Sequence, residues 1–343
     1  MTTNFGIRTP FRHPVAAPIA LAVSALMIAL PYLVNTGALF FWTTVLVTVL
    51  FASSVNLLFG VADIPSFGQA AFFGAGGYTV AILAPHAWPA PLVLLAAVGV
   101  AGVVAAVTSL ITWRTTGLAF AMLTLAIAQA LYTLVIKTSF LGGFNGLPDI
   151  VAPNLGPIVL SAPRPFWYFS LVSVVIGLAL LWQVEHSPFG HVLRSIRENA
   201  VRATYLGISV RAYRAVAFII AGAVAGLAGG LSVYANEIAT VNILYWTQSA
   251  LPIIMLLVGG RHHFFGPAIG AVILTWLVND LSQQTAAYFF YIGLLLLAVL
   301  LIFPEGILGL PDAVRRWARS SRQPEPASPR EQPLRHDRTG DSA

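Results

Sequence analysis

Long apolar runs constrain the fold of this chain more than any other feature. An α-helix needs about 20 apolar residues to cross the hydrocarbon core of a bilayer. Backbone polar groups inside lipid must pair within their own segment, so such runs fold as helices. Runs of this kind lie near residues 15–34, 38–59, 90–112, 117–136, 166–184, 213–235, 264–281 and 286–303. We therefore predict an all-α integral membrane protein.

Two further runs, 66–84 and 249–258, are shorter or broken by glycine, and they raise the expected number of transmembrane helices to about ten. Only 9% of the residues are charged and 58% are hydrophobic, whereas a soluble domain carries about 25% charged residues. A soluble chain with so little charge could not cover its surface. The alternative of a soluble protein with a very apolar core is therefore disfavoured.

The positions of the basic residues predict an orientation. Arg8 and Arg12 precede the first run, which resembles a signal peptide but lacks a clear small-residue cleavage site, so we interpret it as an uncleaved helix. Lysine and arginine accumulate in cytoplasmic loops. Ten crossings from a cytoplasmic N-terminus place Arg114, the 185–212 loop, Arg261 and the tail from Arg315 inside, and leave Lys137 and Arg164 outside. This agreement favours ten crossings over eight.

The residues that the chain lacks exclude several functions. It has no cysteine, which rules out disulfides and thiolate chemistry. Its single lysine, Lys137, lacks the preceding glycines of a phosphate-binding loop, so ATP cannot be bound by that motif. His262 and His263 are adjacent and would point apart on a helix, which makes a poor metal site. With no Ser-His or HExxH arrangement either, we expect no catalytic residues, no metal and no cofactor.

The stretch from Asn56 to Tyr78 breaks the rules for a membrane span. Glycines and Pro65 interrupt it, and Ser66 and Gln69 lie beside the break. Irregular backbone at membrane depth survives only where protein buries it or water reaches it, and transporters place such broken helices near the solute. The alternative is an ordinary interfacial loop. We expect the substrate pathway at Ser66 and Gln69, and at two polar residues inside the run 117–136, Thr124 and Gln129.

A second interruption covers Ser249–Leu274. Pro252 and Gly259–Gly260 bound a run too short to span, and Gly266–Pro267 are expected to start the next helix. The similar triplets Phe72–Gly74 and Phe264–Gly266 suggest a duplicated half. Small residues spaced four apart let helices approach closely. This spacing predicts a packing face at Gly222, Gly226 and Gly230.

The segment 186–213 is the one long charged stretch between apolar runs. We predict a single helix that starts at Ser187–Pro188 and ends at Gly207. Its apolar stripe is Val192, Ile196, Ala200, Ala203 and Leu206. Glu198 and Arg202 form a favourable i,i+4 pair. Two interpretations remain at this stage: an amphipathic helix lying on anionic lipid, or a docking helix in a groove of a cytoplasmic partner, which the small residues favour.

The sequence resembles the permease subunits of branched-chain amino acid ABC importers, of the LivM-like type. The resemblance rests on stretches that follow the family's order from about residue 50 to 310. They are "NLLFGVADIPSFGQAAFFGAGGYTVAIL", "TTGLAFAMLTLAIAQAL", "LGGFNGLP", "SPFGHVLRSIRENAVRATYLGISVRAYRAVAFIIAGAVAGLAGGL", "LLVGGRHHFFGPAIGAVIL" and "FPEGILG". It implies a cytoplasmic N-terminus (1–14), a transmembrane permease domain (15–310) with a coupling loop at 187–212, and a cytoplasmic tail (311–343) whose composition predicts disorder.

The resemblance also implies partners and a coupling site. The partners would be a second, LivH-like permease, two cytoplasmic ATP-binding subunits, a periplasmic binding protein and membrane lipid, with no nucleic acid, in the bacterial inner membrane. The ATPase-coupling residues would be Arg197, Glu198, Ala200, Ala203 and Gly207, matching the family pattern "REDExAAxxxGI". Asn199 replaces an acidic residue and is expected to keep helix character.

The solute is left open by the sequence. Asp63 and Pro65 stand where the family commonly has glycine and leucine, and "GGRHHFFG" replaces a more glycine-rich stretch. Branched-chain amino acids and related amides, urea or aromatic acids all fit. The alternative function is an ion-coupled secondary transporter or channel without an ATPase. It would require carboxylates inside the membrane, whereas Asp63, Glu237 and Asp280 all lie near span edges.

Overall fold

A computed structural model describes residues 16–86, 88–152, 159–261, 263–284 and 306–309, with six isolated positions between 285 and 305. These residues form helices and connecting turns. The α-helices are α1 (Ala16–Leu33), α2 (Thr36–Asn56), α3 (Gln69–Leu83), α4 (Ala90–Ile111), α5 (Gly117–Lys137), α6 (Pro163–His186), α7 (Pro188–Glu198), α8 (Ala200–Tyr205), α9 (Val210–Asn236), α10 (Thr247–Gly259) and α11 (Gly266–Gln284). The all-α prediction therefore holds over the described residues.

Among the described residues, five segments are long and apolar enough to cross a membrane. They are Thr36–Val61, which joins α2 to a π-helical segment (Leu57–Val61), and helices α4, α5, α6 and α9. Helices α3 and α10 have only 15 and 13 residues. The chain is thus a multi-pass membrane protein, while the expected count of ten crossings remains a prediction. The run 286–303, the N-terminal segment 1–14 and the tail 311–343 lie largely or wholly outside the described residues.

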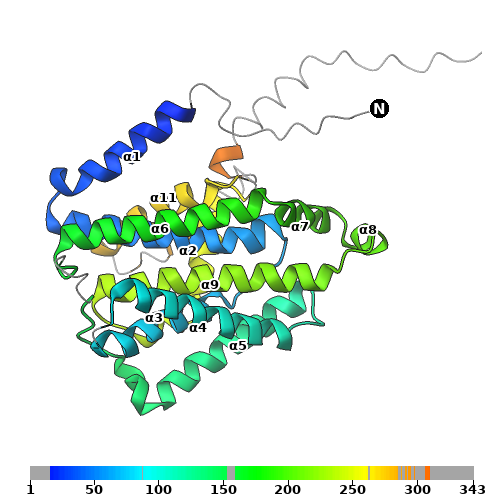
Figure 1. Ribbon diagram of the computed structural model, residues 1–343, viewed down its shortest axis with the longest axis horizontal. Coiled ribbons are helices and arrows are strands. Elements are labelled where there is room, and N and C mark those ends of the chain that lie inside the picture. Colours follow the sequence, from blue (N-terminus) through cyan, green and yellow to red (C-terminus); the bar gives the residue numbers. More distant parts are fainter. Residues whose placement is uncertain are drawn as a thin grey trace, which may run out of the picture.

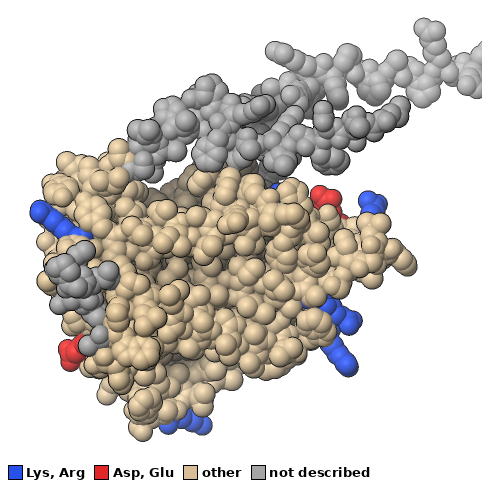
Figure 2. All heavy atoms as spheres, in the orientation of Figure 1, with Lys and Arg blue, Asp and Glu red and all other residues tan. Residues whose placement is uncertain are grey.

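The long helices run roughly alongside one another (Figure 1). In this view α6, α2 and α9 are stacked, α3, α4 and α5 lie below them, and α7 and α8 project at one end. Charged side chains lie at the margins of the visible face, mostly toward its two ends, whereas its broad middle carries none (Figure 2). A belt without charge between two charged ends is what a bilayer requires of a spanning protein.

Small residues allow close packing at the junction of α3, α4 and α9. On α9, a Cβ added to Gly226 would lie 2.2 Å from the Cβ of Ala101 on α4. Gly222 would similarly meet Ala105, and Gly230 would meet Val80, Leu94 and, at 3.5 Å, Ala97. The glycine row and the alanine row have the same four-residue spacing, so they interlock. The predicted packing face of α9 is confirmed.

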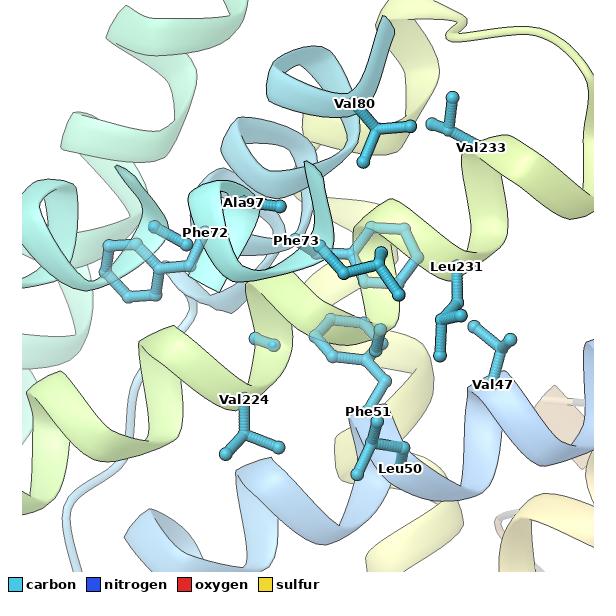
Figure 3. Close-up of a cluster of buried hydrophobic side chains, with 14 of the residues drawn as sticks. Val47, Leu50, Phe51, Phe72, Phe73, Val80, Ala97, Val224, Leu231 and Val233 are labelled. Atoms are coloured by element: carbon cyan, nitrogen blue, oxygen red, sulfur yellow. The ribbon is translucent and has the colours of Figure 1, made fainter. Parts of the chain in front are cut away.

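Larger apolar side chains fill the space around this junction. The rings of Phe51 from α2 and Phe73 from α3 are tilted by 36° with their centroids 4.5 Å apart, and Leu231 from α9 lies beside them (Figure 3). Phe72 projects to the other side of α3, where its ring makes an edge contact with Phe218 at 5.2 Å. Aromatic contacts of this kind add to the dispersion energy that holds helices together in lipid.

The helix pairs repeat a packing theme. Helices α3 and α4 pack on each other and on α9, and α10 and α11 pack on each other and on α2. In each case two consecutive helices pack on one long helix, which is the arrangement expected if the two halves arose by duplication. The triplets that suggested a duplication are not equivalent, however. Phe72–Gly74 lies inside α3, whereas Phe264–Gly266 forms the turn into α11, so their similarity does not relate the two pairs.

Two sets of loops gather at opposite ends of the helices. At one end, Arg197 of α7 contacts Gly60, which also lies against Arg261. At the other end, Leu147 pairs with Ala239 in an isolated antiparallel bridge. Thr36, Pro163 and Glu237 line one cavity at that second end. These loops therefore form two separate groups, and the predicted alternation of ten crossings stays a prediction.

Candidate coupling and translocation site

The charged segment between α6 and α9 begins and ends as predicted. Ser187 caps α7, its side-chain oxygen accepting a hydrogen bond from the N–H of Gly190 at 3.4 Å, and Pro188 occupies the first turn. At the far end Gly207 adopts a φ of 82°. The N–H of Gly207 donates to the carbonyl of Thr204, and that of Ile208 to the carbonyl of Ala203. These are the two bonds of a Schellman motif, which favours glycine.

The prediction of one continuous helix is wrong, because the segment breaks at Asn199. This residue has an extended conformation (φ −159°, ψ 95°), and its side-chain oxygen caps α8 by accepting from the N–H of Arg202 at 2.8 Å. Asparagine favours this N-cap position over a helix interior, so Asn199 does not keep helix character. The expected ion pair between Glu198 and Arg202 is also absent, because the two residues lie on opposite sides of the break.

The apolar side chains of α7 and α8 divide into a buried and an exposed set. Leu193, Ile196 and Ala203 are buried against the rest of the chain. Ala203, expected to contact a partner, is therefore covered by its own chain, and Ala200 is half-buried. Glu198 and Gly207 are exposed. The apolar side chains that face outward are instead Val201, Tyr205 and Leu206, exposed to 66%, 87% and 74%.

Arg197 ties α7 to the membrane-embedded body of the protein. Its Nη1 donates a hydrogen bond to the carbonyl oxygen of Gly60, in the π-helical segment that ends α2. A side chain at position 60 would collide with Asn56 and with the backbone of Arg261, so the contact requires glycine. Arg194 adds an ion pair of 2.7 Å to Glu185 near the end of α6. The two arginines clamp α7 to α2 and α6.

The predicted helix break between α2 and α3 is present at residues 62–68. The hydroxyl oxygen of Ser66 accepts from the N–H of Gly68 at 3.2 Å, and that of Thr124 accepts from the N–H of Phe67 at 3.3 Å. Gly68 also lies directly against Thr124. The structure therefore brings Ser66 and Thr124 together at the break, although they lie far apart in the sequence.

Gln69 begins α3 beside this break and is fully buried. Neither its amide nitrogen nor its amide oxygen makes a hydrogen bond within the described residues. The neighbouring N–H of Ala70 donates to the hydroxyl of Ser249 on α10 at 2.8 Å. Sequence reasoning missed Ser249, because only the tertiary structure places the start of α10 against the start of α3. Two short helices thus begin side by side at the break.

Gln129 lies further along α5, and no described contact joins it to the break. Its Oε1 atom is buried and has no hydrogen-bond partner among the described residues. The structure therefore brings three of the four predicted pathway residues together and leaves the fourth apart. Such buried amides are costly in an apolar setting unless a partner reaches them.

A larger cavity, of about 360 Å³, lies among α2, α3, α9, α10 and α11. None of the four predicted pathway residues lines it. Its polar lining consists of uncharged side chains, among them Thr44, Thr48, Ser232, Asn236, Gln248 and Thr275. Phe51, Phe73 and Met255 supply apolar surface. Sequence reasoning missed this cavity, although Thr44, Thr48 and Phe51 share one face of α2 by their spacing.

No metal site accompanies these features, because the described residues hold no group of three metal-ligating side chains. The arrangement is that of a membrane protein with an interrupted helix pair, a polar cavity and a basic segment clamped to one end. A sequence profile of the family described as branched-chain amino acid transport system, permease component, matches residues 37–304. The chain belongs to this family.

Individual relatives agree with the family match. The high-affinity branched-chain amino acid transport system permease protein LivM of Escherichia coli K12 is 23% identical over 84% of this chain and 73% of its own length. A probable branched-chain amino acid transport permease protein LivH of Methanocaldococcus jannaschii is 28% identical over 76% of this chain and 88% of its own. The guanosine ABC transporter permease protein NupQ of Bacillus subtilis is 34% identical over 40% of this chain. No solved structure gives a significant match.

The chain is therefore a transmembrane permease component of an ABC transport system. The matched region includes the helix break, the polar cavity and the segment α7–α8.

Proposed function

We propose that this chain is the LivM-like permease subunit of an ATP-driven importer in the bacterial inner membrane. A second, LivH-like permease, two cytoplasmic ATP-binding subunits and a periplasmic binding protein would complete the importer. ATP hydrolysis would take place on the ATP-binding subunits. Family membership supports the permease role, and the absence of a phosphate-binding lysine motif in this chain is consistent with a separate motor.

The coupling proposal rests on the bond between Arg197 and the carbonyl of Gly60. Helix α8 would meet the ATP-binding subunits through its exposed Val201, Tyr205 and Leu206, flanked by Glu198 and Gly207. Arg197 is hydrogen-bonded to Gly60, just before the helix break. A displacement of α7 would therefore also displace residues 62–68. Packed helices transmit such displacements as rigid bodies. In this proposal, movement of the ATP-binding subunits is transmitted through α8 and α7 to the helix break.

The solute would pass close to this break. Gln69 offers a buried amide that lacks a partner among the described residues, Ser66 and Thr124 supply further polar groups at the break, and Gln129 would lie further along the route on α5. Branched-chain amino acids are the first solutes to test, since relatives are named for their transport. One relative is named for guanosine transport, so guanosine is added to the solutes to be tested. Amides, urea and aromatic acids complete this set.

A double variant tests the coupling role. Replacing Glu198 and Gly207 by alanine removes one exposed charge and strains the left-handed turn that ends α8. We expect the transporter to assemble in the membrane, hydrolyse ATP and lose most of its uptake in reconstituted vesicles. The matched control is Gly99→Ala on α4, where an added methyl group meets nothing within 4 Å. Normal uptake and normal ATPase binding by the double variant would contradict the coupling proposal.

The ion-coupled alternative lacks the carboxylates that it needs. Asp63, Glu237 and Asp280 are exposed at helix ends. Glu185 is buried, but it is paired with Arg194. Within the described residues no acidic side chain is available inside the bundle to carry a coupling proton or sodium ion.

A further inference from the structure

A third cavity, at the end of the molecule that carries α7 and α8, has a lining with net positive charge. It lies between the end of α4, the start of α5, the start of α9 and the helix-break loop. Arg211 and Arg214 line it from the first turns of α9, together with Phe218 on the same helical face. Its volume is about 60 Å³. Since one water needs roughly 10–15 Å³ of such space, the cavity has room for a phosphate-sized group.

The cavity holds hydrogen-bond donors that nothing in the described structure satisfies. Arg214 is half-buried, and its Nε atom is buried without an acceptor. Guanidinium groups carry only donors, so a buried one calls for an anionic partner. Thr116, which precedes α5, makes no side-chain bond to the free N–H groups of that helix. These N–H groups and the helix dipole favour an anion at the same place.

The one acidic residue of the lining, Asp63, does not neutralise the arginines. It is exposed and forms no ion pair with Arg211 or Arg214, all three being described residues. The hydroxyls of Thr112 and Thr115 already donate to backbone carbonyls at 2.9 Å each. The lining therefore keeps an excess of positive charge and unpaired donors.

The surroundings of the cavity favour a lipid as the source of the anion. Large apolar side chains beside the cavity point away from the protein, and they are Leu110, Ile111, Leu118 and Met122, exposed to 58–76%. An acyl chain could lie along this surface while its headgroup enters the cavity. Basic pockets between membrane helices on the cytoplasmic side suit anionic headgroups. We propose that Arg211 and Arg214 form a binding site for the phosphate of an anionic phospholipid.

The proposal concerns a lipid ligand and stands apart from the solute and the coupling role. It is tested with the full-length chain, purified with its transporter subunits and titrated with phosphatidylglycerol, phosphatidylcholine and inorganic phosphate under native mass spectrometry. Phosphatidylglycerol should bind tightest. Arg211→Gln and Arg214→Gln should each weaken its binding roughly fivefold, and their combination should weaken it further. Arg214→Lys, which keeps the charge, should recover part of the loss.

The matched control is Arg202→Gln, an exposed arginine on α8 that does not line the cavity, and it should bind phosphatidylglycerol as the unaltered chain does. Size-exclusion profiles confirm that each variant is folded. Equal binding of the two lipids, or equal losses in Arg202→Gln and the cavity variants, would overturn the proposal. Inorganic phosphate binding as tightly as phosphatidylglycerol would overturn the assignment to a lipid.

Discussion

A single proline determines how α1 is attached to the rest of the protein. Pro31 lies inside α1 and has no N–H, so the carbonyl of Met27 loses its usual partner four residues on. Trp167 on α6 replaces that partner, its Nε1 donating to the Met27 carbonyl at 3.1 Å. Tyr168 donates likewise to the carbonyl of Ile28 at 2.8 Å. The carbonyl that Pro31 leaves free in α1 is thus used to attach α1 to α6.

This compensation predicts a non-additive pair of substitutions. Trp167→Phe leaves the Met27 carbonyl without a partner, which costs about 1–3 kcal/mol when the group is shielded from water. Pro31→Ala restores an N–H within α1, so the same tryptophan substitution should cost less in that background. The free energy of unfolding in detergent is measured for the unaltered chain, both single variants and the double variant. These values give the interaction free energy between positions 31 and 167. Strict additivity would show that the Trp167 bond does not compensate for the proline.

The glycines of α9 make a second prediction about single residues. Gly226→Ala places a methyl group 2.2 Å from the Cβ of Ala101, which forces α4 and α9 apart. Overpacking of this kind costs about 1–3 kcal/mol. Gly99→Ala is the matched control, because it lies in open space on α4 and should be neutral or slightly stabilising. Denaturation midpoints compare the two, and equal midpoints would refute the interlocked packing.

At the scale of the element, Asn199 decides the shape of the coupling segment. It ends α7 and caps α8, so the two short helices form an angled unit rather than one rod. A break here frees Val201 and Tyr205 to face outward while Ile196 stays buried. Helical periodicity alone could not reveal this, because the apolar spacing continues across the break.

Cap chemistry at this position can be tested directly. Asn199→Ala removes the bond to the N–H of Arg202 and should destabilise α8 by about 1 kcal/mol. Asn199→Asp keeps an acceptor and should preserve the cap. Hydrogen exchange of the Arg202 amide should accelerate several-fold in the alanine variant and remain slow in the aspartate variant. Equal exchange in both would mean that the cap does not hold α8.

For the whole molecule, the grouping of charged loops at two ends predicts which ends face the cytoplasm. The chain has no cysteine, so single cysteines report unambiguously on location. Ser195→Cys on α7 should react with a membrane-impermeant maleimide only from the cytoplasmic side. Ser139→Cys after α5 and Ser282→Cys at the end of α11 should react only from the outside. Labelling of Ser195→Cys from outside would invalidate both the orientation and the coupling proposal.

The sequence by itself determined the membrane class, the positions of the long helices, the helix break after α2 and the family. These follow from local properties: apolar length, glycine and proline positions, and motif order. The tertiary structure alone decided that Thr124 and Ser249 meet the break, that Arg197 binds Gly60 and that Arg214 faces a cavity. Each of these depends on contacts between helices distant in the chain, which periodicity does not encode. Asn199 was expected to keep helix character, because the apolar stripe continues across it, and only the structure shows that it ends α7 and caps α8.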